Sequence, residues 1–169
     1  MSYSRIDEGG LQWPCPTRDH PGTPHLFSGG FPRGKGRFTT VRYLPSLEQV
    51  DKEFPFLLTT GRLLFQYHTG GMTRRVKAID AVSHESYIEI NPEDAGMLSL
   101  KEGTPVKVTS RRGSITVKTK ISKRPKKGVV FIPFHFHEAA ANMLTSGTGL
   151  DPVAKIPSFK VSTVRIEKV

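Results

Sequence analysis

Short apolar or alternating stretches recur along the chain after residue 46, and turns rich in glycine, proline and charged residues separate them. Side chains that alternate with a period of two place one face of a β-strand against a core, and short continuous apolar runs fit fully buried strands. The pattern therefore predicts six short strands. They cover residues 56–60, 87–91, 105–110, 114–121, 129–133 and 161–169.

The clearest local signal is a hairpin, because the third and fourth stretches flank the short turn Arg111-Arg112-Gly113. A helix is predicted over residues 92–98, where Asn91 is a candidate N-cap and Pro92 stands at the first helical position. The alanine-rich residues 138–144 predict a second helix of about two turns. Short strands with few helices and no repeated strand–helix–strand unit predict a mainly β fold, a small closed barrel with helical crossovers.

Residues 1–46 follow a different pattern, with many prolines and glycines and no periodic apolar positions. Such a segment is expected to be an extended arm. It also contains Trp13, Phe27, Phe31 and Phe38, and aromatic residues are unusual in a plain flexible linker. We therefore expect an arm over residues 1–46, packed on the barrel of residues 47–169 or on another domain.

Composition limits the possible functions. The 169 residues, 36% of them hydrophobic, suffice for one domain with a real core. The single cysteine, Cys15, allows no internal disulfide and is too few for an iron–sulfur or zinc site. No stretch has the length of a transmembrane segment or the pattern of a signal peptide, so a cytoplasmic location is expected. The net charge of +10 predicts an anionic partner, which can be nucleic acid, a phosphorylated cofactor or an acidic protein surface.

The stretch of residues 56–76, FLLTTGRLLFQYHTGGMTRRV, combines a buried strand with a polar loop. The loop carries hydroxyl groups, a histidine, a glycine pair and arginines. Backbone amides and guanidinium groups favour phosphate oxygens, so the loop suits an anionic ligand. The alternative is an ordinary strand followed by a solvated basic loop.

Several segments, in order along the chain, carry a family resemblance that covers nearly all of it. These segments are RIDEGGLQWPCPTRDHPGTPHLF, LLTTGRLLFQYHTGGMTRR, IEINPEDA, VTSRRGSITVKTKISKRPKKGVVFIPFHF, ANMLT and IPSFKVSTVRIE. With them the sequence resembles the C-terminal molybdopterin dinucleotide-binding domain of molybdopterin-dependent oxidoreductases, and most closely that of the formate dehydrogenase catalytic (alpha) subunit. The resemblance implies a six-stranded double-psi β-barrel.

The resemblance also implies a cofactor, bis(molybdopterin guanine dinucleotide) with molybdenum or tungsten, over which this domain closes. The family's iron–sulfur cysteines, its cysteine or selenocysteine metal ligand and its catalytic histidine and arginine belong to earlier domains. No catalytic residue and no metal ligand is therefore assigned here. We expect the chain to work with the remainder of the catalytic subunit on formate, and to be inactive alone.

Candidate cofactor contacts follow from the positions that match the family segments. Arg62 supplies a planar donor, Gly61 permits close backbone approach, Asn142 offers an amide to ring edges, and Lys160 can neutralise phosphate or pterin charge. His68 has an equally good interpretation as a hydrogen-bonded structural group, and Met72 as buried packing. The candidates are Thr60, Gly61, Arg62, Gln66, Tyr67, His68, Thr69, Gly71, Met72, Thr73, Asn142, Phe159 and Lys160.

Other interpretations remain open from the sequence. A related enzyme that reduces nitrate or another oxyanion would share this domain. A basic barrel that binds nucleic acid would need exposed aromatic residues among lysines and arginines on strands, and here the aromatic residues gather at strand ends and in the arm, so no nucleic-acid partner is expected. His135 and His137 share one face of an extended segment and could form half of a zinc site. No second pair of ligands is evident in the sequence, so the zinc interpretation is weak.

Overall fold

The computed structural model describes residues 1–169, which form two compact units, Met1–Leu44 and Pro45–Val169. Regular structure is concentrated in the second unit, which contains all of the strands. No helix in either unit is long and apolar enough to cross a membrane.

The first unit has one short helix, α1 (Tyr3–Asp7), and otherwise irregular backbone. The guanidinium group of Arg5 donates to the carbonyl oxygen of Arg18 and, at 2.7 Å, to that of His20. These bonds fold the first residues back on the segment that follows them. Large apolar side chains of this unit are nevertheless exposed, including Trp13 at 73% and Phe38 at 102%.

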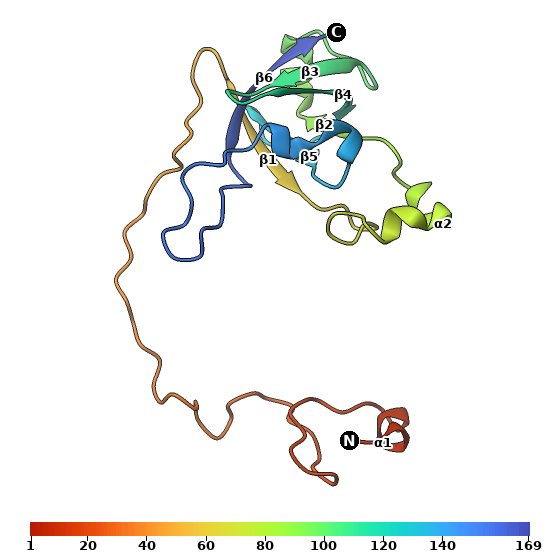
Figure 1. The fold of residues 1–169 in the computed structure, drawn as a ribbon, viewed down its shortest axis with the longest axis vertical. Coiled ribbons are helices and arrows are strands. Elements are labelled where there is room, and N and C mark those ends of the chain that lie inside the picture. The colour runs from red at the N-terminus through yellow and green to blue at the C-terminus, as the bar shows by residue number, and fades with distance from the viewer. The chain divides into compact units, whose positions relative to one another are not determined.

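The second unit is a closed barrel with the strand order β1-β5-β2-β4-β3-β6, shown in Figure 1. The predicted strands are all present, with each bound within one residue of the prediction. The strands are β1 (Phe56–Gly61), β2 (Tyr87–Ile90), β3 (Pro105–Thr109), β4 (Ser114–Ile121), β5 (Val129–Pro133) and β6 (Ser162–Lys168). Strands β3 and β4 form the predicted hairpin, with Thr109 opposite Ser114.

The pairing of the strands has an internal two-fold symmetry. Exchanging each strand with the one three places later in the chain leaves every pairing unchanged. Under this exchange the parallel pair β1–β5 becomes the parallel pair β4–β2, and the antiparallel pair β1–β6 becomes β4–β3. The barrel is the predicted double-psi β-barrel, a mainly β fold with short helices.

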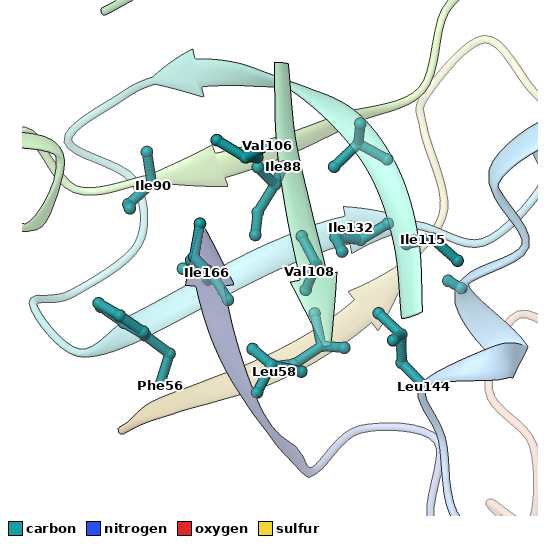
Figure 2. Packing of buried hydrophobic residues seen from close by; sticks show 14 of the residues in the cluster. Phe56, Leu58, Ile88, Ile90, Val106, Val108, Ile115, Ile132, Leu144 and Ile166 are labelled. Atoms are coloured by element: carbon teal, nitrogen blue, oxygen red, sulfur yellow. The ribbon is translucent and has the colours of Figure 1, made fainter. Parts of the chain in front are cut away.

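The core is built from the alternating apolar positions that the sequence pattern marks. Their side chains point to the inside of the barrel in Figure 2, and they are withdrawn from water. Burial of each of these side chains contributes about 1.5–3 kcal/mol. The fully buried positions are Leu58, Ile88, Ile90, Val106, Val108, Val130, Ile132, Leu144 and Val164.

The helix that follows β2 is α3 (Pro92–Met97), close to the predicted range. The backbone amide of Glu93 donates to Asn91 Oδ1 at 3.0 Å, which confirms Asn91 as the N-cap. The amide group of Asn91 also donates to the carbonyl oxygen of Pro125 at 3.0 Å. Asn91 therefore fixes both the start of the helix and the turn that precedes β5.

The predicted helix over residues 138–144 is wrong. Two short 3-10 turns, η2 (His137–Ala139) and η3 (Ala141–Met143), stand there, separated by Ala140 in an extended conformation with ψ 101°. Ala139, Ala141 and Leu144 are all buried against the barrel. A continuous helix would turn at least one of them away, so packing overrides the helix propensity of alanine.

The loop after β1 contains short helical turns that the pattern did not predict. These are η1 (Thr73–Arg75) and α2 (Lys77–Asp80). Neither has a side-chain N-cap or a buried apolar residue, and such turns leave no periodic signal in a sequence.

Candidate functional site

The ends of two parallel strands bring the candidate residues together. Strands β1 and β5 are parallel and in register, so Gly61 at the end of one lies beside Pro133 at the end of the other. The polar loop of residues 62–76 and the segment of residues 134–143 therefore leave the barrel at the same end, which we call the site edge. This edge is the place where residues far apart in the sequence meet.

A cavity of about 420 Å³ lies at this edge. Segments after β1, after β5 and before β6 contribute to its wall, and most of the wall consists of predicted cofactor contacts. The lining residues are Thr60, Arg62, His68, Thr69, Phe134, Asn142, Phe159 and Lys160. Phe134 is the one member outside the predicted set.

Hydrogen bonds fix one wall of this cavity to the end of β1. The hydroxyl group of Thr60 donates to the carbonyl oxygen of Phe159 at 2.7 Å. The ammonium group of Lys160 donates to the carbonyl oxygen of Thr60 at 2.6 Å. Lys160 has no carboxylate partner, so its positive charge is held at the cavity without neutralisation.

Arg62 and Asn142 are exposed on the cavity wall and have no side-chain hydrogen bond or ion pair within the chain. Arg62 offers several N–H donors in a planar fork, and Asn142 offers both donor and acceptor groups. Together with Lys160, they make the cavity basic and rich in donors. Its chemistry suits an anionic ligand with polar ring edges or phosphate groups.

Other predicted residues shape the loop and do not line the cavity. Gln66 is buried, and its Oε1 accepts a hydrogen bond of 2.6 Å from the hydroxyl group of Thr73. The same hydroxyl oxygen accepts from the backbone amide of Tyr67 at 3.2 Å. Gln66 and Thr73 therefore close the loop on itself. The side chains of Tyr67 and Met72 are exposed outside the cavity, so Met72 is not buried packing.

His68 is held in an unusual backbone conformation, with φ 53°, and its ring meets Phe134 edge to face at a centroid distance of 5.7 Å. Gly70 also has a left-handed φ, 73°, which costs glycine little. A Cβ at Gly70 would lie 2.9 Å from the Arg74 side chain, whereas one at Gly71 would meet nothing within 4 Å. The loop therefore needs glycine at position 70 for its own packing.

Gly61 has a structural role in the packing of the barrel wall. A Cβ at this position would lie 2.7 Å from Cε2 of Phe131 on the neighbouring strand β5. The absence of a side chain is therefore required by the packing of the barrel wall. The role expected from the sequence, close approach of a ligand to the backbone, stays a prediction.

Arg74 joins the two segments that form the edge, and the sequence analysis did not single it out. Its guanidinium group donates to Glu138 at 2.6 and 3.0 Å, contacts Asp80 at 3.4 Å and lies over the ring of Phe136. The hydrogen bonds from Arg74 lower the pKa of the Glu138 carboxyl group to about 2. Since Glu138 lies 64 residues away, no local sequence signal could have revealed this pair.

His135 and His137 do not act as a pair. His135 is buried, and neither of its ring nitrogens has a hydrogen-bond partner, whereas His137 is exposed and lies 3.1 Å from Arg74. Burial lowers the pKa of His135, and the charge of Arg74 acts in the same direction. The chain contains no group of three or more His, Cys, Asp or Glu side chains that could hold a metal ion.

The fold and the site together define a double-psi β-barrel with a basic cavity at the ends of two parallel strands. Residues 56–163 match the family model described as the molydopterin dinucleotide binding domain. The chain belongs to this family, whose ligand is a molybdopterin-type cofactor.

The chain is similar to part of several larger enzymes. It is 48% identical to the F420-dependent formate dehydrogenase subunit alpha of Methanocaldococcus jannaschii, over 100% of this chain and 25% of that protein. It is 41% identical to the assimilatory nitrate reductase catalytic subunit of Bacillus subtilis, over 98% of this chain and 24% of that protein. The chain thus spans about a quarter of the length of these relatives.

A solved structure shows the same fold. Acetylene hydratase from Pelobacter acetylenicus superposes with a TM-score of 0.63 over 70% of this chain and 19% of that protein. The sequence identity is 17%, so the likeness concerns the fold alone.

Proposed function

We propose that the chain is the cofactor-capping part of a molybdenum or tungsten formate dehydrogenase catalytic subunit, and that it closes over bis(molybdopterin guanine dinucleotide) for the oxidation of formate to CO2. The observation that carries this proposal is the cavity at the shared end of β1 and β5, because three distant segments line it with Arg62, Asn142 and Lys160, whose charged groups have no carboxylate partner. The full coverage of the chain by formate dehydrogenase relatives supports the choice of substrate.

The residues of the cavity fit such a cofactor. Arg62 and Lys160 carry positive charges without acidic partners, which favours pyrophosphate or pterin oxygens. Asn142 and His68 can pair with ring edges, and Phe134 and Phe159 supply apolar surface that excludes water. When bound, the cofactor supplies the metal and the redox chemistry, while these side chains bind and orient it.

The remaining components belong to polypeptide beyond this chain. The relatives are about four times as long, and we assign to their other domains the iron–sulfur cluster, the metal ligand and the catalytic residues. The chain alone is accordingly inactive toward formate. We assign the enzyme to the cytoplasm.

The test uses the complete catalytic subunit that contains this domain. We expect Arg62→Gln, Asn142→Ala and Lys160→Gln, combined, to lower the metal and pterin content of the purified enzyme at least several-fold, with a parallel loss of formate-dependent dye reduction. The matched control is Lys107→Gln, which removes an equally positive but exposed side chain on β3, away from the cavity. A triple variant that retains its full cofactor content would overturn the site assignment.

A related oxyanion reductase is the second candidate function. The nitrate reductase relative, at 41% identity, favours it. The two candidates share the cofactor cavity and differ in substrate, so the same purified enzyme separates them. Formate-dependent reduction of a dye supports the first, and nitrate-dependent oxidation of a reduced dye supports the second.

A further inference from the structure

A second cavity, of about 490 Å³, lies on the outer surface of β1, β2 and β5. Its floor includes Val129 and Phe131, and its wall includes Tyr87 and Glu89. Arg62 borders both this cavity and the candidate cofactor cavity. The two hollows are therefore neighbours at one end of the barrel.

Glu89 is the unusual member of this second cavity. It is only 4% exposed, and its Oε1 is buried without any hydrogen-bond partner. The nearest positive group is Nε of Arg124, at 3.9 Å, on a side chain that is 80% exposed. A carboxylate so withdrawn from water, with so distant a partner, is destabilising for the isolated barrel.

The neighbouring strand does not supply the missing donor. Lys120 is the register partner of Glu89 on β4, yet its ammonium group lies over the ring of Tyr87, 4.4 Å from the ring centroid. The outward-facing surface of β2 thus holds a carboxylate whose Oε1 accepts no hydrogen bond within the chain and whose charge partner, Arg124, stays 3.9 Å away. A guanidinium or ammonium group from outside would satisfy it with a charge-assisted hydrogen bond.

The surroundings of the cavity indicate that a polypeptide supplies this group. Leu64 lines the cavity with 91% of its surface exposed, and the adjacent Phe65 is 54% exposed. Exposed apolar side chains beside a buried charge are typical of a surface that a partner covers. The chain spans about a quarter of its relatives, so covering polypeptide exists in proteins of this kind.

We infer that an arginine or lysine side chain from the rest of the catalytic subunit inserts into this cavity and donates to Glu89, which locks the barrel onto the remaining domains. The inference rests on the proposed function, because it takes the chain as one part of a larger subunit. It assigns to Glu89 a role in holding the domains together, without contact to the cofactor.

The test compares two variants in two settings. Glu89→Gln removes the buried charge, and the matched control Glu93→Gln removes an exposed one that is paired with Lys127 at 3.1 Å. In the 169-residue chain, we expect Glu89→Gln to leave the urea midpoint of unfolding unchanged or raised. In the complete subunit, we expect the same change to speed proteolytic release of the barrel at least several-fold, whereas Glu93→Gln has no effect in either setting.

The diagnostic result is faster release of the barrel from the complete subunit without any destabilisation of the 169-residue chain. Equal destabilisation of the 169-residue chain by Glu89→Gln and Arg124→Gln would show that Arg124 is the true partner and would overturn the inference. An unchanged release rate in the complete subunit would also overturn it. Metal and pterin content, measured on the same samples, reports separately on the proposed function.

A cross-linking measurement identifies the partner directly. A benzoylphenylalanine at position 64, in place of Leu64 on the cavity wall, is irradiated in the complete subunit and the products are mapped by mass spectrometry. We expect adducts on a segment outside this chain that contains an arginine or lysine. Adducts confined to this chain, or none, would contradict the inference.

Discussion

Individual side chains at the edge of the barrel hold two separate loops in one geometry. The Arg74 guanidinium group does this for the loop after β1 and the segment after β5, through Glu138. The pair is partly exposed, with the carboxylate side chain 52% accessible, so its contribution to stability is modest. Its value for function is that it fixes the positions of residues on two sides of the cavity.

The ion pair between Arg74 and Glu138 should give stability a defined pH dependence. The pKa of Glu138 is lowered to about 2 in the folded protein from an ordinary 4.5. Its contribution is therefore fully present well above pH 4.5 and is lost as the pH falls toward 2. We expect Glu138→Gln to lower stability by about 0.5–1 kcal/mol at pH 7 and the difference from the wild type to shrink below pH 4.5, as measured by urea unfolding. Glu167→Gln, at an exposed pair with Arg165, is the control, and a difference that does not vary with pH would contradict the assignment.

Gly61 provides a second test at the scale of one residue. Because a Cβ there meets Phe131 at 2.7 Å, we expect Gly61→Ala to destabilise the barrel by about 1–3 kcal/mol. The double variant Gly61→Ala with Phe131→Val should recover part of this loss, which thermal unfolding would measure. If Gly61→Ala folds with unchanged stability and only the cofactor content falls, the glycine serves the ligand and our packing explanation is wrong.

At the scale of elements, the strands were predictable and their partners were not. Apolar and polar residues alternate over stretches such as 114–121, which shows directly that one face of the strand is buried. Each strand could therefore be placed from the local pattern alone. The parallel pairing of β1 with β5 joins segments about 70 residues apart, and no local pattern encodes it. The same limit applies to the site, where Lys160 reaches the carbonyl oxygen of Thr60 across 100 residues of sequence.

The wrong prediction of a helix over residues 138–144, where the structure has η2 and η3, shows a second limit of prediction from sequence. Three alanines favour a helix in isolation, but Ala139, Ala141 and Leu144 must all be buried against the barrel, and a continuous helix cannot turn all of them to one side. Resemblance to a family supplied the candidate site residues, which physical pattern alone could not. It did not reveal Arg74, or that Gln66 and Thr73 serve the shape of the loop.

The Asn91 cap offers a test at the scale of one helix. Asn91 accepts from Glu93 and donates to Pro125, so it connects the start of α3 with the turn before β5. We expect Asn91→Ala to cost about 1 kcal/mol or more, and Asn91→Asp to retain the cap while losing the bond to Pro125. Urea unfolding should therefore rank the wild type first, Asn91→Asp second and Asn91→Ala last. Equal stability of the aspartate and alanine variants would show that the cap itself contributes nothing.

At the scale of the whole molecule, the chain combines a core formed within the barrel alone with exposed surfaces suited to binding a partner. Every residue of the hydrophobic core cluster lies between Phe56 and Ile166, and the two-fold pairing closes the sheet without a free edge. The first unit, in contrast, exposes large apolar side chains such as Trp13, Phe38 and Tyr43. The net charge of +10 adds an electrostatic attraction to acidic surfaces.

Removing residues 1–44 tests whether the first unit serves association with a partner and not the stability of the barrel. Because the core cluster contains no residue from the first unit, we expect the protein of residues 45–169 to unfold at a temperature within a few degrees of that of the whole chain. We expect the exposed aromatic residues of the arm to contact the rest of the catalytic subunit, so the shortened protein should co-purify with that polypeptide several-fold less well. The variant Trp13→Ala with Phe38→Ala in the whole chain should reproduce the loss of association without any change in unfolding, while Lys35→Ala in the same segment should not. If the shortened protein unfolds far earlier than the whole chain, the arm stabilises the barrel itself, and its aromatic residues are not an outward-facing surface.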